Sequence, residues 1–137
     1  MSDQPSGGEH WRFCAPTPPI AGLDTARLDS LRDLDPGDTS YLDRAIGNFQ
    51  VNSVGAVEAI RGFIETRDAA GLRASAHKIA GSALNLGVPR AGEAARSLEL
   101  VADRGTTVGA SALLPELDES MAEGRALLLT YQSTYAE

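Results

Sequence analysis

The sequence has little of several residue types, and each shortage narrows the class of protein. It contains one cysteine, Cys14, so no disulfide can form within the chain and no cysteine-based metal site is expected. Aromatic residues make up 5% of the chain, while alanine and leucine are abundant, and this balance favours helices over strands. No apolar run approaches the roughly 18 residues of a membrane-spanning helix.

Positive charge is also scarce. The formal net charge is −7 at pH 7, so the surface would repel the phosphates of a nucleic acid and the headgroups of an anionic membrane. Residues 1–20 lack the basic and then apolar plan of a signal peptide. We therefore expect a cytoplasmic protein that binds neither nucleic acid nor membrane.

The chain divides into two parts of different composition. Proline is concentrated in residues 1–21, which also contain Ser6, Gly7 and Gly8, and we interpret this segment as a disordered tail or linker. Residues 22–137 carry helical periodicity and suit one compact domain. Trp11 and Phe13 leave open the alternative that part of the tail docks on this domain.

Five helices are expected after the tail, because apolar residues recur at helical spacing between clear start and stop signals. Asp38, Thr39 and Ser40 are candidate N-caps of the second helix, and Gly47 and Gly55 suggest a bend or short break within it. The expected ranges are 23–34, 41–67, 69–86, 89–104 and 112–132, with Asp68 and Ser111 as further N-caps, Gly87 as a C-terminal stop and Pro115 tolerated in the first turn. Short connections imply antiparallel neighbours. The predicted fold is all-α: an up-and-down antiparallel four-helix bundle with an additional N-terminal helix.

The third of these helices places a histidine on its outer face. At about 100° per residue, His77 lies opposite Ile79 and Leu86, which belong to the stripe that should face the core. Its neighbours on the outer face are small, charged or isolated apolar residues: Arg73, Ala74, Lys78, Ala80, Gly81 and Leu84. A glycine inside a helix costs about 1 kcal/mol relative to alanine, and here it leaves room for another protein to approach the imidazole.

Two interpretations of this face stand side by side. In one, His77 is a nucleophile or anion carrier presented to a docking partner, with Arg73 and Lys78 supplying positive charge. In the other, His77 is an ordinary solvated residue, and the alanines are present because alanine is the best helix former.

The stretch "AHKIAGSALNLG", residues 76–87, resembles the signature of histidine-containing phosphotransfer (HPt) domains. That signature combines an Ala-His pair, an apolar residue two positions later, Lys-Gly-Ser, and a later Leu-Gly. Ala76-His77, Ile79, Gly81-Ser82 and Leu86-Gly87 match it, and the similarity covers nearly everything after residue 22. The chain departs from the pattern at Ala80, where the family usually has lysine, and at Ala83, where it has a second small polar residue.

The resemblance implies a phosphorelay intermediate in two-component signalling. His77 would accept a phosphoryl group from a receiver-domain aspartate and pass it to another receiver. Gly81 would provide clearance, Arg73 and Lys78 would screen the phosphoryl charge with Ser82 as a weaker candidate, and Ala74, Ala80 and Leu84 would form the docking surface. An alternative role for Ser82 is a local hydrogen bond to the preceding turn.

The expected partners are response-regulator receiver domains, with a hybrid sensor histidine kinase as a further candidate. The receiver is expected to bring Mg²⁺, so this chain needs no cofactor or metal of its own, and monomer is the default state. No Gly-rich nucleotide-binding segment or H-E-x-x-H pattern is present, which indicates a phosphocarrier rather than an enzyme with its own nucleotide site. The alternative function is a helical adaptor that binds a receiver or kinase without carrying phosphate.

Overall fold

In the computed structural model, residues 18–35 and 37–135 are described. Most of the predicted tail, residues 1–17, lies outside the described residues, as do Trp11, Phe13, Cys14 and His10. Across the described ranges the chain forms helices without any strand, as predicted. The helices are α1 (Thr25–Arg32), α2 (Ser40–Glu65), α3 (Ala69–Asn85), α4 (Pro89–Asp103) and α5 (Ala110–Ser133).

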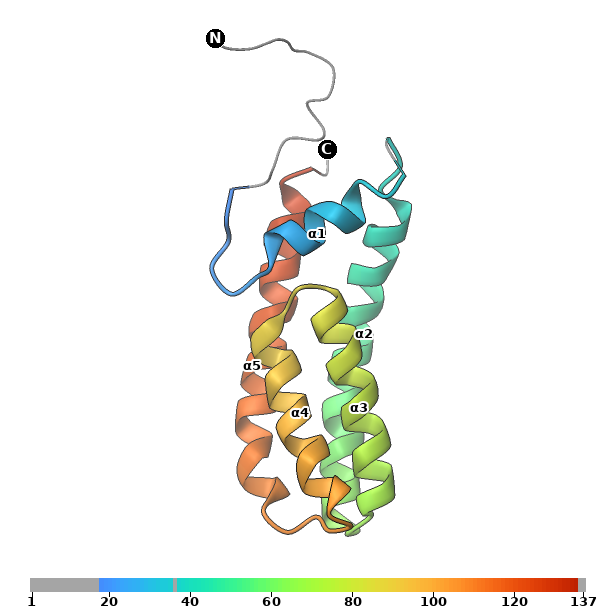
Figure 1. Cartoon of the computed structure of the whole chain (residues 1–137), viewed down its shortest axis with the longest axis vertical. Helices are drawn as coiled ribbons and strands as arrows, with labels where there is room; N and C mark the ends of the chain where they lie inside the picture. The colour runs from blue at the N-terminus through green and yellow to red at the C-terminus, as the bar shows by residue number, and fades with distance from the viewer. Residues whose placement is uncertain (1–17, 36, 136–137) are drawn as a thin grey trace.

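Helices α2 to α5 run along the long axis of the molecule as an antiparallel bundle, and α1 lies across one end of it (Figure 1). Each long helix packs against its neighbours in chain order, and α5 closes the ring on α2. The predicted four-helix bundle with an additional N-terminal helix is therefore confirmed. No helix in the described part of the chain is long and apolar enough to cross a membrane.

The end of α3 is fixed by a glycine and by contacts with α1. Gly87 has a φ of 69°, in the left-handed region that favours glycine, and its carbonyl accepts a hydrogen bond from the backbone N–H of Asp24 at 2.8 Å. A Cβ at Gly87 would lie 2.8 Å from the Asp24 carbonyl oxygen. Arg27 of α1 also donates from Nε to the carbonyl of Asn85 at 3.1 Å. These contacts hold the end of α3 in place.

Several predicted boundaries need correction. Of the bend or short break suggested within α2, the break is wrong, because this helix runs unbroken past Gly47 and Gly55. The first two helices end at Arg32 and Glu65, two residues earlier than predicted.

The start of α5 is also corrected. Ser111 is not its cap, since the helix starts at Ala110 after Gly109. Pro115 consequently lies beyond the first turn, where its missing N–H leaves one carbonyl near the helix start without its usual helical partner. The Asp68 cap of α3 is confirmed, since its carboxylate accepts from the Gly71 N–H at 2.9 Å.

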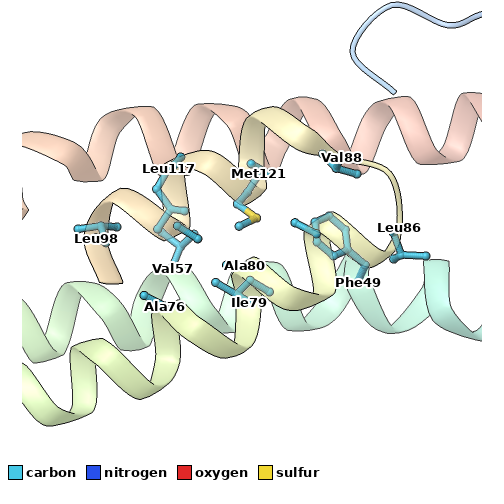
Figure 2. Packing of buried hydrophobic residues seen from close by; sticks show 14 of the residues in the cluster. Phe49, Val57, Ala76, Ile79, Ala80, Leu86, Val88, Leu98, Leu117 and Met121 are labelled. Carbon is cyan, nitrogen blue, oxygen red and sulfur yellow. The ribbon is translucent and has the colours of Figure 1, made fainter. Parts of the chain in front are cut away.

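The core is made mainly of aliphatic side chains from the four long helices, together with Phe49, Tyr131 and two leucines of α1. Leu72 and Ile79 of α3, and Leu86 directly after it, are 0–4% exposed, as the helical pattern predicted. Figure 2 shows Ile79 and Ala80 of α3 directed into the interior that Met121 of α5 also fills.

Small residues line the contact between α3 and α4, and we call this contact the α3–α4 seam. Its buried alanines are Ala76, Ala80 and Ala83 of α3 with Ala91, Ala94 and Ala95 of α4. Small side chains let two helix axes approach closely. The seam therefore brings the outer edges of α3 and α4 within reach of each other.

Candidate functional site

The imidazole of His77 stands on the outer edge of α3, and its side chain is 72% exposed. The position follows from the helical register, because Ala76 and Ile79 on either side of it are buried at 0% and 4% exposure. The predicted outward orientation of His77 is therefore confirmed.

A hydrogen bond to α4 fixes the orientation of the imidazole. Its Nδ1 lies 2.7 Å from Oε2 of Glu99 on α4, whose side chain is only 12% exposed. An ionised carboxylate only accepts hydrogen bonds, so Nδ1 carries the hydrogen and donates it to Glu99. The lone pair of the neutral ring is then on Nε2, the nitrogen that faces away from α4.

One turn along the same edge, a second pair links the two helices. Arg73 donates from Nε to Oδ1 of Asp103 at 2.5 Å. This hydrogen bond, together with the nearby carboxylates, raises the pKa of Arg73. Arg73 and His77 are four residues apart on α3, and their partners Asp103 and Glu99 are four residues apart on α4. The two pairs therefore lie side by side across the α3–α4 seam.

The small residues predicted around His77 divide into exposed and buried positions. Ala74 and Gly81 are exposed, and a Cβ added at Gly81 would meet nothing within 4 Å. The prediction that Ala80 belongs to an exposed docking surface is wrong, because it is 2% exposed. Ala80 lies on the flank of α3 that α4 covers, so it contributes to the α3–α4 seam instead.

Leu84 is only partly available for docking. It is 37% exposed, and its Cγ would lie 2.6 Å from a Cβ added at Gly92 of α4. The absence of a side chain at Gly92 therefore makes room for Leu84, which covers part of the α3–α4 seam with one side and meets solvent with the other.

Ser82 and Lys78 lie on the opposite side of His77, toward α2. The hydroxyl of Ser82 donates to the carbonyl of Lys78 at 3.3 Å, which is the local hydrogen bond considered from the sequence. Lys78 is exposed and makes no ion pair with any residue of the described ranges. Its ammonium group therefore remains available to an anionic partner.

A surface hollow runs between α2 and α3 beside the histidine, and we call it the α2–α3 groove. Its larger part has a volume of about 350 Å³ and is lined by Val51, Asn52, Gly55, Ala56, Ser75, Lys78, Ile79 and Ser82. A second hollow continues it toward Asn85 and Leu86 through shared lining residues. Val51, which lines the groove, and Val54 on the same helix are 71% and 48% exposed, so both apolar side chains are accessible to a partner.

Sequence reasoning missed Glu99, Asp103 and the α2 side of the site. Glu99 lies 22 residues from His77, and only the packing of α3 on α4 brings the two together. The α2 surface did carry a sequence signal: residues 45–57 contain no charged side chain in a chain that is 23% charged. No group of three or more metal-ligating side chains occurs in the residues that the structure describes.

The comparisons with known proteins point to the same class of molecule. The family model of the Hpt domain matches residues 41–126, a range that includes both His77 and Glu99. The crystal structure of histidine-containing phosphotransfer protein B (HptB) from Pseudomonas aeruginosa PAO1 superposes with a TM-score of 0.76 at 24% sequence identity, covering 86% of this chain and all of that one. That structural likeness supports the fold.

No curated protein sequence gives a significant match to this chain. The Hpt model, however, spans more than half of its length. The chain therefore belongs to the Hpt domain family, the histidine phosphotransfer carriers of two-component systems, which work with receiver domains and kinases.

Proposed function

We propose that His77 accepts a phosphoryl group from the aspartyl phosphate of one receiver domain and passes it to the aspartate of a second receiver. The observation that carries this proposal is the pairing of an exposed imidazole with a nearly buried carboxylate, Glu99, at Nδ1. This pairing fixes the ring and directs Nε2 outward.

The chemistry follows from the assignment of the ring hydrogen. The Nε2 lone pair attacks the phosphorus of the aspartyl phosphate, the P–O bond to the carboxyl group breaks, and the aspartate leaves with the bonding electrons as a carboxylate. His77 then carries the phosphoryl group on Nε2 and a hydrogen on Nδ1, so the ring becomes a cation. Glu99 stabilises that positive charge through the same 2.7 Å hydrogen bond. Reversal of the step on a second receiver returns the neutral ring.

The surface around His77 supports docking of a globular partner. Gly81 leaves open space one turn after the histidine, and the α2–α3 groove offers apolar and uncharged polar residues beside it. Apolar centres with few charges are typical of protein interfaces. In this proposal the receiver rests on α3 and the α2–α3 groove, and Lys78 faces acidic groups of the partner.

The proposed division of labour leaves little chemistry to this chain. Phosphoryl transfer depends mainly on positioning and charge stabilisation, and the receiver would supply Mg²⁺ and the aspartate. The protein would act as a monomeric carrier without a nucleotide site. A hybrid sensor kinase is a candidate source of the first receiver.

The test is labelling by a phosphorylated receiver. The wild-type protein should acquire acid-labile, base-stable phosphate, and His77→Gln should not acquire it while retaining its helical circular dichroism. His10→Gln is the matched control, because His10 is the only other histidine, and it should label normally. Phosphate retained by His77→Gln would exclude His77 as the acceptor. Tight binding of a receiver without any phosphohistidine would favour the adaptor function instead.

A further inference from the structure

The pair formed by Arg73 and Asp103 lies one helical turn from the pair formed by His77 and Glu99. Side chains four residues apart on a helix have Cβ atoms about 5–6 Å apart, so the Arg73 side chain is long enough to reach the surroundings of the imidazole. The carboxylate of Glu99, which contacts His77, contributes to the raised pKa of Arg73. The guanidinium therefore already lies in the electrostatic field of the histidine site.

Most of the hydrogen-bonding capacity of Arg73 is unused. A guanidinium has five N–H donors, and Arg73 donates from Nε to Asp103 without a further hydrogen bond to any described residue. Its side chain is 58% exposed. Asp103 thus fixes the position of the guanidinium by one atom and leaves both terminal nitrogens open to an anion in solvent.

The two other candidates for this positive charge are less well placed. At position 80 the side chain is a buried alanine, so that position supplies no cation. Lys78 is exposed, but it lines the α2–α3 groove on the side of His77 away from Glu99. Of the two cations of α3, Arg73 is the one that lies on the α3–α4 edge, the same edge as the hydrogen-bonded imidazole.

We propose that Arg73 binds the phosphoryl group on His77 through its terminal nitrogens while Asp103 holds its Nε, which makes Asp103 a positioning residue for the phosphorylated state. The proposal rests on the function proposed above, because it requires phosphate on His77. In this role Asp103 has an effect opposite to that of its own negative charge. A carboxylate near a phosphoryl group repels that group, whereas a carboxylate that orients an arginine helps the arginine to bind it.

Repulsion of the phosphoryl group and positioning of Arg73 are opposite effects of Asp103, and substitutions of Asp103 distinguish them. If Asp103 acted only by repulsion, Asp103→Ala would favour the phosphorylated protein. If it positions Arg73, the same change disfavours it, because a released arginine side chain samples many rotamers. Asp103→Asn keeps an oxygen that accepts from Nε, and it should behave like the wild type. All three proteins should fold alike, since Asp103 is exposed.

The first experiment uses phosphoramidate as donor and needs no receiver. Nε2 attacks the phosphorus, the P–N bond breaks, and ammonia leaves after taking up a proton. NMR spectra of arginine Nε–H groups are recorded before and after phosphorylation. The Arg73 signal should shift in the wild type and in Asp103→Asn, but not in Asp103→Ala. Arg90, which is held by glutamates of α5, should not shift in any of them.

The second experiment measures the equilibrium of phosphoryl transfer from a phosphorylated receiver. Asp103→Ala should lower the equilibrium fraction of phosphohistidine about threefold, the size expected of an exposed charge pair, and Arg73→Gln should lower it equally. The double variant should show no additional loss, because both changes remove the same interaction.

The outcomes separate the two proposals. Phosphohistidine that forms while the Arg73 signal stays unmoved overturns the role of Arg73 and Asp103 alone. A gain of phosphohistidine in Asp103→Ala does the same, because it shows repulsion. Failure of both donors to phosphorylate His77 overturns the proposed function, and the further inference with it.

Discussion

Glu99 is 12% exposed, yet its Oε2 lies 2.7 Å from Nδ1 of the 72% exposed His77. A carboxylate that is mostly withdrawn from water makes a stronger hydrogen bond than one in bulk solvent, because the local dielectric is lower. The relationship couples a solvent-facing nucleophile to the packed edge of α4. The orientation of His77 therefore depends on the packing of the bundle.

Removal of the Glu99 carboxylate should slow phosphoryl transfer to His77. In Glu99→Gln the amide N–H₂ is able to donate to Nδ1, which would move the ring hydrogen to Nε2 and block the attacking lone pair. Loss of a charge-assisted hydrogen bond predicts a rate about tenfold lower, or about 1.4 kcal/mol at the barrier. Rapid-quench labelling measures the rate, and ¹⁵N NMR of the ring reports the tautomer.

Glu93→Gln is the matched control for that experiment, because Glu93 is an exposed glutamate on the same helix. It should leave both the rate and the tautomer unchanged. A Glu99→Gln protein that labels as fast as the wild type would show that the hydrogen bond contributes nothing to the transfer step.

The sequence predicted the outward orientation of His77 but not its partner. Helical periodicity is a local property, and it correctly placed Ile79 and Leu86 in the core. Glu99 reaches His77 only because the α3–α4 seam is lined by alanines, and the sequence of α3 alone does not specify which edge of α4 it meets. Ala80 was misplaced for the same reason: a helical wheel gives the direction of a side chain, but not how far a neighbouring helix wraps around it.

The substitution Gly81→Ala should raise the stability of the protein but slow its phosphorylation by a receiver. A Cβ at this position would meet nothing within 4 Å, and alanine is favoured over glycine in a helix by about 1 kcal/mol. We therefore expect a more stable protein in urea denaturation. Labelling by a receiver should nevertheless slow, because the added methyl group occupies the space proposed for the partner.

Gly47→Ala is the control for the Gly81 variant. Gly47 is also an open glycine within a helix, and it lines neither hollow of the α2–α3 groove. It should gain similar stability with no loss of labelling. Equal labelling by both variants would show that the partner does not approach Gly81 closely.

The free energy of unfolding should depend on pH in the acidic range, because of hydrogen bonds to Asp43 at the end of the bundle near α1. Asp43 accepts hydrogen bonds from the hydroxyl of Tyr135 at 2.6 Å, from Gln132 Nε2 at 3.0 Å and from Thr39 Oγ1 at 2.8 Å. These bonds, with that of Tyr135 the largest cause, lower the pKa of Asp43. Its contribution to stability is therefore complete above the unfolded-state pKa of about 3.9 and is lost as the pH falls through the lower folded-state pKa.

The measurement is the free energy of unfolding in urea between pH 5 and pH 2. Asp43→Asn should flatten the loss of stability at the acidic end of this range. Tyr135→Phe, which removes the strongest donor and keeps the carboxylate, should flatten it partly. An unchanged slope in Asp43→Asn would mean that Asp43 does not link folding to proton uptake.

Ala80→Lys should test whether the usual lysine of the family fits this chain. Ala80 is 2% exposed within the α3–α4 seam. A lysine at this position must either push α4 outward or bend its side chain to bring the ammonium group to water. We expect a loss of stability of about 2 kcal/mol, and a weakened hydrogen bond between His77 and Glu99 because α4 shifts. Ala74→Lys, at an exposed position of the same helix, should change stability by less than about 0.5 kcal/mol. If Ala80→Lys were as stable as the wild type and labelled faster, the seam would have room for the cation, and Arg73 would not be required in its place.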